Sequence, residues 1–108
     1  MKEGLSYDDV LLAPQYSDIT SRSEIAIGNK MGDTWLEVPV IASPMDTVSG
    51  AAMAKAIYDC GAMAILHRYN TPAEQANLIL RAKEDSPNLN VGIAVGVSED
   101  YLMRVRLA

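Results

Sequence analysis

Hydrophobic residues in the last two thirds of the chain form short runs that alternate with stretches of helical period. The runs lie at residues 39–42, 63–66 and 91–95, and none of them alternates apolar with polar positions. Continuous runs of this length are typical of strands buried on both faces, as in a parallel sheet. We therefore expect three parallel strands, with an apolar inner face that includes Val40, Ile65 and Ile93.

The first stretch of helical period follows the run at 39–42. Ser49 is placed to cap this helix and Gly61 to end it. Met53, Ile57 and Cys60 recur at helical spacing and predict its buried face.

The second and third helices also have clear start signals. Thr71-Pro72-Ala73-Glu74 is a capping box with proline at the first helical position, and Ser98-Glu99-Asp100 offers a later N-cap with two acids. The predicted buried stripe of the second helix is Ala76, Ile79, Leu80 and Lys83, and Ser86-Pro87-Asn88 closes it.

Residues 1–38 are less regular. Turn residues such as Gly32-Asp33 interrupt them, and they predict loops with short extended pieces at residues 25–27 and 35–36. The remainder reads as β-α-β-α-β-α, so the fold class is α/β with parallel strands. The pattern does not give the strand order, and both a doubly wound sheet and a (β/α) barrel satisfy it.

Composition narrows the class of protein. The 108 residues are 49% hydrophobic and 21% charged, as in ordinary globular domains, and the net charge of −5 without a basic cluster argues against nucleic-acid binding. No apolar run approaches the ~20 residues of a membrane span, and no secretory signal begins the chain. One cysteine and one histidine exclude an internal disulfide and a zinc cage. We expect an acidic cytoplasmic protein without a membrane or nucleic-acid partner.

In parallel α/β folds, ligands gather at the carboxyl ends of the strands. Ser43, Met45 and Asp46 follow the first run, and offer hydrogen-bonding groups beside an adaptable apolar side chain. His67 and Arg68 follow the second, where arginine suits a phosphate or a planar base. The structural alternative is that Ser43 and Asp46 tie down a turn, that His67 bonds a neighbouring loop, and that Arg68 pairs with an acid.

Two further features are interpreted as structural. Cys60 is expected to be a buried, inert thiol at the helix end away from the strand ends. The acid pairs Asp8-Asp9 and Glu99-Asp100 are typical of turns and caps, so we predict no metal site.

Five ordered motifs resemble the IMP dehydrogenase/GMP reductase family. They run through essentially the whole chain: Leu5-Ser6-Tyr7-Asp8-Asp9-Val10-Leu11-Leu12-Ala13-Pro14, Ser21-Arg22-Ser23-Glu24, Val38-Pro39-Val40-Ile41-Ala42-Ser43-Pro44-Met45-Asp46-Thr47-Val48, Ile65-Leu66-His67-Arg68 and Val95-Gly96-Val97-Ser98-Glu99-Asp100. The resemblance favours the barrel, and implies that residues 1–108 are the N-terminal portion of one catalytic (β/α)8 TIM barrel without a CBS insertion.

The resemblance also implies site roles. Ser43 and Met45 would contact the purine nucleotide, and Asp46 would help to hold their loop. Ser21 and Arg22 match a pair that reaches a nicotinamide cofactor across a subunit boundary. His67 and Arg68 would also belong to the cofactor site, with Arg68 as a basic contact.

The family reaction is hydride transfer through a covalent cysteine–purine adduct. Its catalytic cysteine lies outside these residues, so no catalytic residue is expected here and the 108 residues alone should be inactive. The implied cofactor is NAD or NADP, with a monovalent cation (K⁺) in the complete enzyme, and the implied assembly is a homotetramer that acts on IMP or GMP.

Two details bear on which reaction is catalysed. Ser43-Pro44-Met45-Asp46 is similar to the dehydrogenases, which convert IMP to XMP with NAD. The direct junction at residues 83–90 is typical of the reductases, which convert GMP to IMP with NADPH. A third alternative, from another class, is a non-catalytic half-barrel or one chain of a split enzyme.

Overall fold

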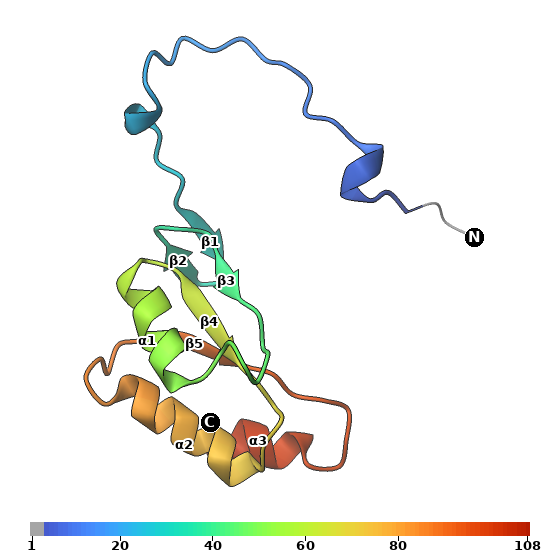
Figure 1. Ribbon diagram of the computed structural model, residues 1–108, viewed down its shortest axis with the longest axis vertical. Helices are drawn as coiled ribbons and strands as arrows, with labels where there is room; N and C mark the ends of the chain where they lie inside the picture. Colours follow the sequence, from blue (N-terminus) through green and yellow to red (C-terminus); the bar gives the residue numbers. More distant parts are fainter. Residues whose placement is uncertain (1–3) are drawn as a thin grey trace.

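Two small sheets organise the computed structural model, which describes residues 4–108. Strands β1 (Asn29–Met31) and β2 (Thr34–Leu36) form an antiparallel hairpin. Strands β3 (Ile41–Ala42), β4 (Met63–Leu66) and β5 (Val91–Ile93) form a parallel sheet in the order β3-β4-β5 (Figure 1). The three predicted parallel strands and the α/β class are therefore confirmed.

Helical connections follow each parallel strand. They are α1 (Ala51–Asp59), α2 (Pro72–Lys83) and α3 (Tyr101–Leu107), and two 3-10 turns precede the hairpin, η1 (Tyr7–Asp9) and η2 (Arg22–Glu24). The strands β3 and β5 are shorter than the apolar runs that predicted them. Pro39 has no N–H to donate, and the last rung between β4 and β5 is the bond from Ala94 N to Leu66 O, 2.9 Å long.

The core lies between one face of the parallel sheet and the helices α1 and α2. Ala64 and Leu66 of β4 pair in register with Val91 and Ile93 of β5, and the buried cluster comprises Ala54, Ala64, Leu66, Ile79, Ala82 and Leu89. Ile93 packs against this cluster, so its prediction as an inner-face residue is wrong. Because paired residues share a face, the other side of the sheet carries Met63, Ile65 and Gly92.

The buried stripes of both longer helices are offset from the predicted ones. In α1 the buried residue is Ala54, whereas Met53 and Cys60 are exposed. In α2 the buried residues are Gln75, Ile79 and Ala82, whereas Leu80 is 68% exposed. The sheet and the neighbouring helix decide which part of an apolar surface is covered, and side-chain hydrophobicity alone predicted a different part.

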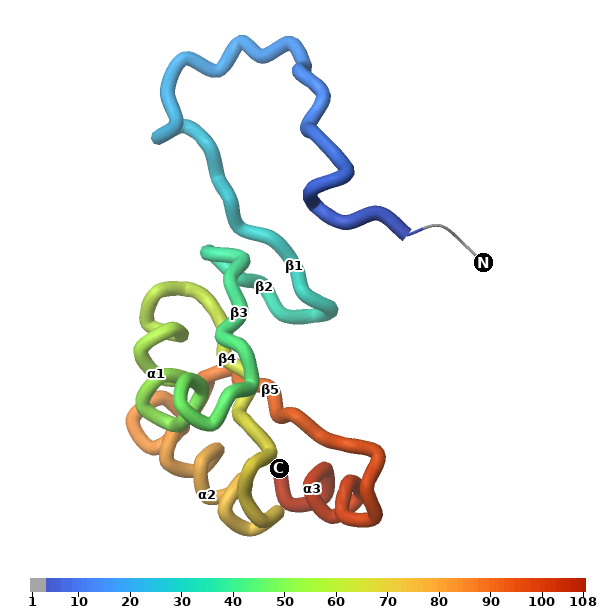
Figure 2. The backbone as a smooth tube through the Cα atoms, turned by 45° about the vertical axis from the view of Figure 1, so that its right-hand side comes forward, coloured from blue at the N-terminus to red at the C-terminus, as the bar shows by residue number. Residues whose placement is uncertain are grey.

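The first third of the chain lies apart from the parallel sheet. Figures 1 and 2 show residues 4–28 as a long arm beyond the β1–β2 hairpin, at the end of the molecule opposite α3. The hairpin turns at Gly32-Asp33, and Gly32 has φ +58°, a conformation that glycine adopts without strain. Residues 25–27, predicted to be extended, form no strand.

Two helix starts differ in how they are built. Gly50, and not Ser49, is the N-cap of α1. The predicted capping box of α2 is confirmed: Glu74 N donates to Thr71 Oγ1 over 3.2 Å, while Thr71 N donates to Glu74 Oε2 over 2.7 Å. The backbone N–H of Thr71, followed by its hydroxyl, holds the pKa of Glu74 below its ordinary value.

This capping box predicts a pH-dependent contribution to the free energy of unfolding. A lowered folded-state pKa means that the stabilisation is fully present above the ordinary glutamate pKa of about 4.3 and is lost as pH falls through the folded value. We expect Glu74→Gln to lower the thermal unfolding midpoint near pH 7. The difference in midpoint between the variant and the wild type should shrink below pH ~4. Glu84→Gln, at the other end of α2, is the control. An equal difference in midpoint at every pH would contradict the stabilising role of the ionised Glu74 carboxylate.

Candidate functional site

The loop after β3 is held by its own backbone and by one buried hydroxyl. Met45 N donates to Ser43 O over 2.8 Å, and Ser49 N donates to Met45 O over 2.8 Å. The Ser49 side chain is fully buried, and its hydroxyl donates to Ser43 O. Ser43 and Asp46 are exposed and Met45 is half exposed, so the loop presents all three predicted substrate residues to solvent. Asp46 Oδ1 also accepts from Thr47 N, the next residue of the loop, over 2.9 Å, and its loop-holding role stays a prediction.

The loop after β4 contains His67 and Arg68. His67 is half-buried, its ring stacks on Tyr69 with centroids 6.5 Å apart, and its Nδ1 is buried without a hydrogen-bond partner among residues 4–108. Arg68 is exposed, and its guanidinium lies against Gly96 in the loop after β5, where a Cβ atom would be 2.5 Å from Arg68 Nη1. A side chain at Gly96 would therefore displace Arg68.

Sequence reasoning missed the buried polar side chains that support these loops. Among residues 4–108 they are Ser49, Gln75 and Arg104. Gln75 Nε2 donates to His67 O over 3.0 Å and to Ala94 O over 2.9 Å. A glutamine in the first turn of α2, at helical spacing from Ile79 and Ala82, was the available signal for this role.

Arg104 completes this support from α3. Its Nη2 donates to Asn70 O over 2.6 Å, and its Nε donates to Asp100 Oδ2 over 2.8 Å. The pKa of Asp100 is held below its ordinary value, first by the Ser98 hydroxyl and then by Arg104. The predicted N-cap Ser98-Glu99-Asp100 thus anchors an arginine as well as starting a helix.

Ser21 and Arg22 lie far from these loops within the chain. Both are exposed, and Ser21 caps η2 by accepting from Ser23 N over 3.3 Å. Figures 1 and 2 place η2 in the arm, beyond the hairpin, whereas the loops after β4 and β5 lie at the other end of the sheet. The predicted exposed location outside the sheet is confirmed, and the cofactor role of the pair stays a prediction.

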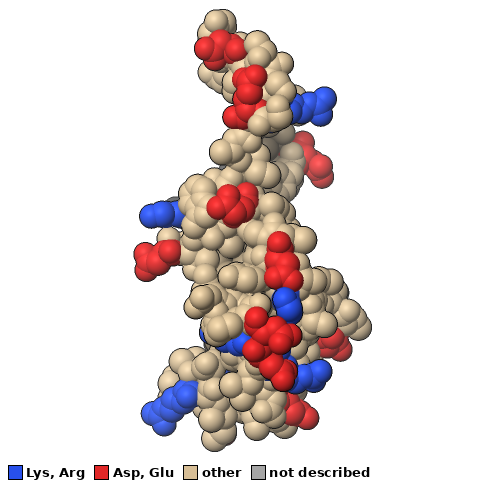
Figure 3. Space-filling model, turned by 90° about the vertical axis from the view of Figure 1, so that its left-hand side faces the viewer, with Lys and Arg blue, Asp and Glu red and all other residues tan. Residues whose placement is uncertain are grey.

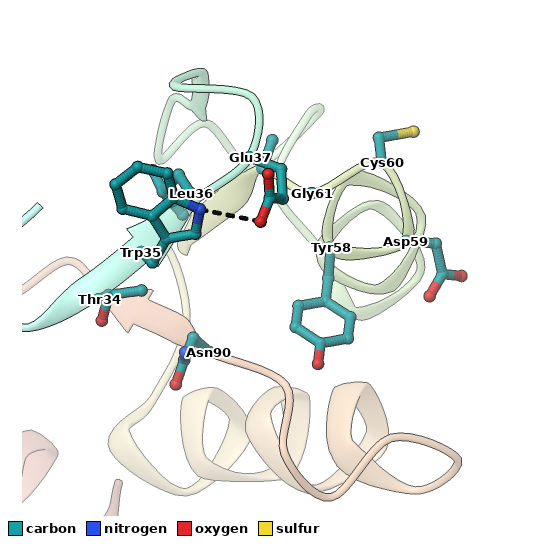
Figure 4. A pocket seen from close by; sticks show the side chains of 10 residues that line it. Thr34, Trp35, Leu36, Glu37, Tyr58, Asp59, Cys60, Gly61 and Asn90 are labelled. Atoms are coloured by element: carbon teal, nitrogen blue, oxygen red, sulfur yellow. Dashed lines mark hydrogen bonds between the residues drawn. The ribbon is translucent and has the colours of Figure 1, made fainter. Parts of the chain in front are cut away.

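A hollow of about 620 Å³ lies at the amino-terminal ends of β4 and β5, away from the predicted site residues. Trp35, Glu37, Tyr58 and Asn90 are among its lining residues, and Trp35 Nε1 donates to Glu37 Oε1 over 2.8 Å (Figure 4). Because ligands of parallel α/β folds collect at the opposite ends of the strands, this hollow is not the candidate site.

Cys60 is exposed beside this hollow, so the prediction that it is buried is wrong. The helix α1 ends at Asp59, and Cys60 is its C-cap, outside the helical residues. In Figure 4 the sulfur points away from the hollow. Its position remote from the carboxyl ends of the strands is the one predicted, and the statement that Cys60 is not the nucleophile stays a prediction.

Charge on the surface is mixed. Figure 3 shows acidic and basic side chains interspersed over one face, without a large basic patch there. Residues 4–108 contain no group of three or more His, Cys, Asp or Glu side chains that could hold a metal ion. Within the same residues, every helix is too short or too polar to cross a membrane.

The Ser49 contact predicts that Ser49→Ala destabilises the protein by about 1–3 kcal/mol, because Ser43 O loses a donor in a partly buried place. Thermal unfolding measures this loss. Thr47→Ala, in the exposed part of the same loop, should change stability by less than ~0.5 kcal/mol. Equal effects of the two substitutions would mean that the loop does not depend on the buried hydroxyl.

Comparison with known proteins shows which family the chain resembles. The family model described as IMP dehydrogenase / GMP reductase domain matches residues 4–108. Inosine-5'-monophosphate dehydrogenase of Nitrosopumilus maritimus is 46% identical over 83 residues, which cover 76% of this chain and 17% of that protein. GMP reductase of Vibrio cholerae is 37% identical over 100 residues, which cover 88% of this chain and 28% of that protein.

A second dehydrogenase, that of Halalkalibacterium halodurans, is 41% identical over 83 residues, which cover 76% of this chain and 17% of that protein. The chain thus spans less than a third of the length of each of these curated relatives. The match of the family model to nearly all of the sequence is decisive, and the chain belongs to the IMP dehydrogenase / GMP reductase family.

Proposed function

We propose that the complete protein is a purine-nucleotide oxidoreductase of the IMP dehydrogenase type, which converts IMP to XMP with NAD. The observation that carries this proposal is the family match over residues 4–108, together with dehydrogenase relatives that reach 46% identity. The parallel sheet supports it, because the loops that carry the predicted nucleotide residues and the cofactor residues His67 and Arg68 both follow the carboxyl ends of strands.

GMP reduction is the second candidate, and one specific observation favours it. Helix α2 ends at Lys83 and strand β5 begins at Val91, so a short connection joins them without an inserted domain. That layout is typical of reductases, and the reductase of Vibrio cholerae aligns with 88% of this chain. The Ser43-Pro44-Met45-Asp46 loop, by contrast, resembles the dehydrogenases.

We further propose that residues 1–108 are the N-terminal portion of a single (β/α)8 barrel without a CBS insertion. The β3-β4-β5 order supports a barrel, in which each successive strand pairs with the one before it. The side of the sheet that carries Ile65 has no covering helix among the described residues (Figures 1 and 2). Further strands of a barrel would enclose it.

Within that barrel, the residues divide into two groups. Ser43 and Met45 bind the purine nucleotide, with Met45 against the base, and Asp46 holds their loop. Met45 suits this role because its half-exposed, flexible thioether offers an adaptable apolar surface to a flat ring.

The cofactor group comprises Ser21, Arg22, His67 and Arg68. A dinucleotide carries phosphates, and the two exposed guanidinium groups of Arg22 and Arg68 suit such a ligand. Bound NAD or NADP would accept or supply hydride. Because η2 lies at the other end of the sheet from His67 and Arg68, Ser21 and Arg22 would serve a neighbouring subunit, in keeping with a cytoplasmic homotetramer. A K⁺ ion in the complete enzyme is part of the same proposal.

The chemistry requires groups beyond this chain. Cys60 lies at the end of the sheet opposite the Ser43–Ser49 loop, so the thiol that attacks the purine must come from elsewhere in the barrel. These 108 residues therefore bind and orient the nucleotide and the cofactor, and they contribute no catalytic residue.

The direct test is an absorbance assay for reduced cofactor with the complete protein. IMP with NAD should produce reduced cofactor, whereas GMP with NADPH should consume it if the protein is a reductase. Turnover of neither pair would refute the proposed function.

Arg22 provides a second test in the complete protein. We expect Arg22→Ala to raise the KM for the cofactor about tenfold, equivalent to ~1.4 kcal/mol, because one charge-assisted contact is lost. The KM for the nucleotide should change by less than about twofold. Lys30→Ala, which removes an exposed cation of β1, is the matched control. An equal rise in both KM values would contradict the cofactor role.

The isolated 108 residues should behave differently from the complete protein. The sheet edges at β3 and β5 are unpaired among the described residues, and exposed edges invite pairing between chains. We expect size-exclusion chromatography with light scattering to detect association or loose packing, and the cofactor assay to detect no turnover. A cooperative monomer at micromolar concentration would contradict the partial-barrel proposal.

A further inference from the structure

The side-chain amide of Gln75 continues the hydrogen-bond ladder beyond the end of the sheet. Strands β4 and β5 make their last backbone rung between Ala94 N and Leu66 O. The next carbonyls, His67 O and Ala94 O, both accept from Gln75 Nε2, over 3.0 and 2.9 Å. Gln75 is fully buried and belongs to α2, so this helix joins the starts of two loops where the strands no longer pair.

Arg104 holds the other end of the first of these loops. Its guanidinium donates to Asn70 O over 2.6 Å, to Asn70 Oδ1 over 3.2 Å and to Gln75 Oε1 over 3.3 Å. The Arg104 side chain is 8% exposed, and an arginine buried to this extent is stable only when its N–H groups are satisfied. Together with Gln75 it forms what we call the loop clamp.

The loop clamp brackets Arg68. His67 O is held on one side of it and Asn70 on the other. The Arg68 guanidinium lies against Gly96, two residues after the clamped Ala94. The backbone on both sides of Arg68 is therefore held by two buried side chains, whose hydrogen bonds go to His67, Asn70 and Ala94 and not to Arg68 itself.

We propose that Gln75 and Arg104 are positioning residues for cofactor recognition, because they preorganise the loop of residues 67–70 and so the cation of Arg68. This inference rests on the proposed function, in which Arg68 contacts the cofactor. A loop ordered in the fold loses little conformational freedom when a ligand binds, whereas a loosened loop must be ordered at the expense of affinity.

The test compares Gln75→Met with Ile79→Ala in the complete protein. Methionine fills a similar space without the amide, and Ile79 is a buried residue one turn away on the same helix. We expect Gln75→Met to raise the KM for the nicotinamide cofactor about tenfold, and to leave kcat and the nucleotide KM within about twofold. Ile79→Ala lowers the unfolding midpoint but should leave all three constants within about twofold.

Arg104→Lys tests the second member of the clamp. Lysine keeps the charge near Asp100 but loses the planar fork that reaches Asn70 and Gln75 together. Arg104→Lys should raise the cofactor KM as Gln75→Met does. The cofactor KM of the double variant should be at most about twice that of either single variant, because both substitutions break the same hydrogen-bond network. Arg106→Lys, on the exposed side of α3, is the control.

Amide hydrogen exchange tests whether Gln75 and Arg104 hold the loops, without relying on enzyme activity. Both clamp variants should speed exchange of the Ala94 amide, which makes the last rung to Leu66 O beside the clamp, by at least about tenfold, whereas Ile79→Ala should not. Unchanged exchange in the clamp variants, or equal cofactor KM values in Gln75→Met and Ile79→Ala, would overturn the inference. An inactive wild type whose clamp variants still speed exchange would instead refute the proposed function and leave the loop clamp standing.

Discussion

The carbonyl groups at the ends of the parallel strands are the constraint on which the candidate site depends. Where β4 and β5 stop pairing, their next carbonyls lie in a partly buried place and need donors. The fold supplies these from helices: Gln75 of α2 serves His67 and Ala94, and Arg104 of α3 serves Asn70. The same bonds that satisfy the backbone also set the course of the loops.

A similar arrangement recurs after β3, where the buried hydroxyl of Ser49 donates to Ser43 O. Each of the buried polar side chains in residues 4–108 thus supports a loop at the carboxyl ends of the strands or a partner that does so. The aliphatic core, by contrast, fixes the helices α1 and α2 on the sheet. Packing places the scaffold, and a few buried hydrogen bonds give its loops a defined shape.

The offset stripes of α1 and α2 explain why part of this arrangement was not predicted. Periodicity identified both helices, but Leu80 and Met53 are more hydrophobic than the residues that are buried in their place, Gln75 and Ala54. A small alanine allows α1 to approach β4 closely, and a glutamine is buried because it finds three hydrogen-bond partners there. Neither requirement can be read from one helix considered alone.

Local patterns in the sequence were sufficient for the three parallel strands, the Thr71–Glu74 capping box, the Gly32-Asp33 turn and the motifs of the family, because each depends on residues that are close along the chain. Tertiary structure alone decided that Ile93 faces the helices, that Cys60 is exposed at a C-cap, and that Arg104 reaches Asn70. The orientation of Ile93 depends on strand register, and the reach of Arg104 depends on a contact between residues more than thirty positions apart. Register and long-range contacts are set by the simultaneous packing of several elements, which no local pattern encodes.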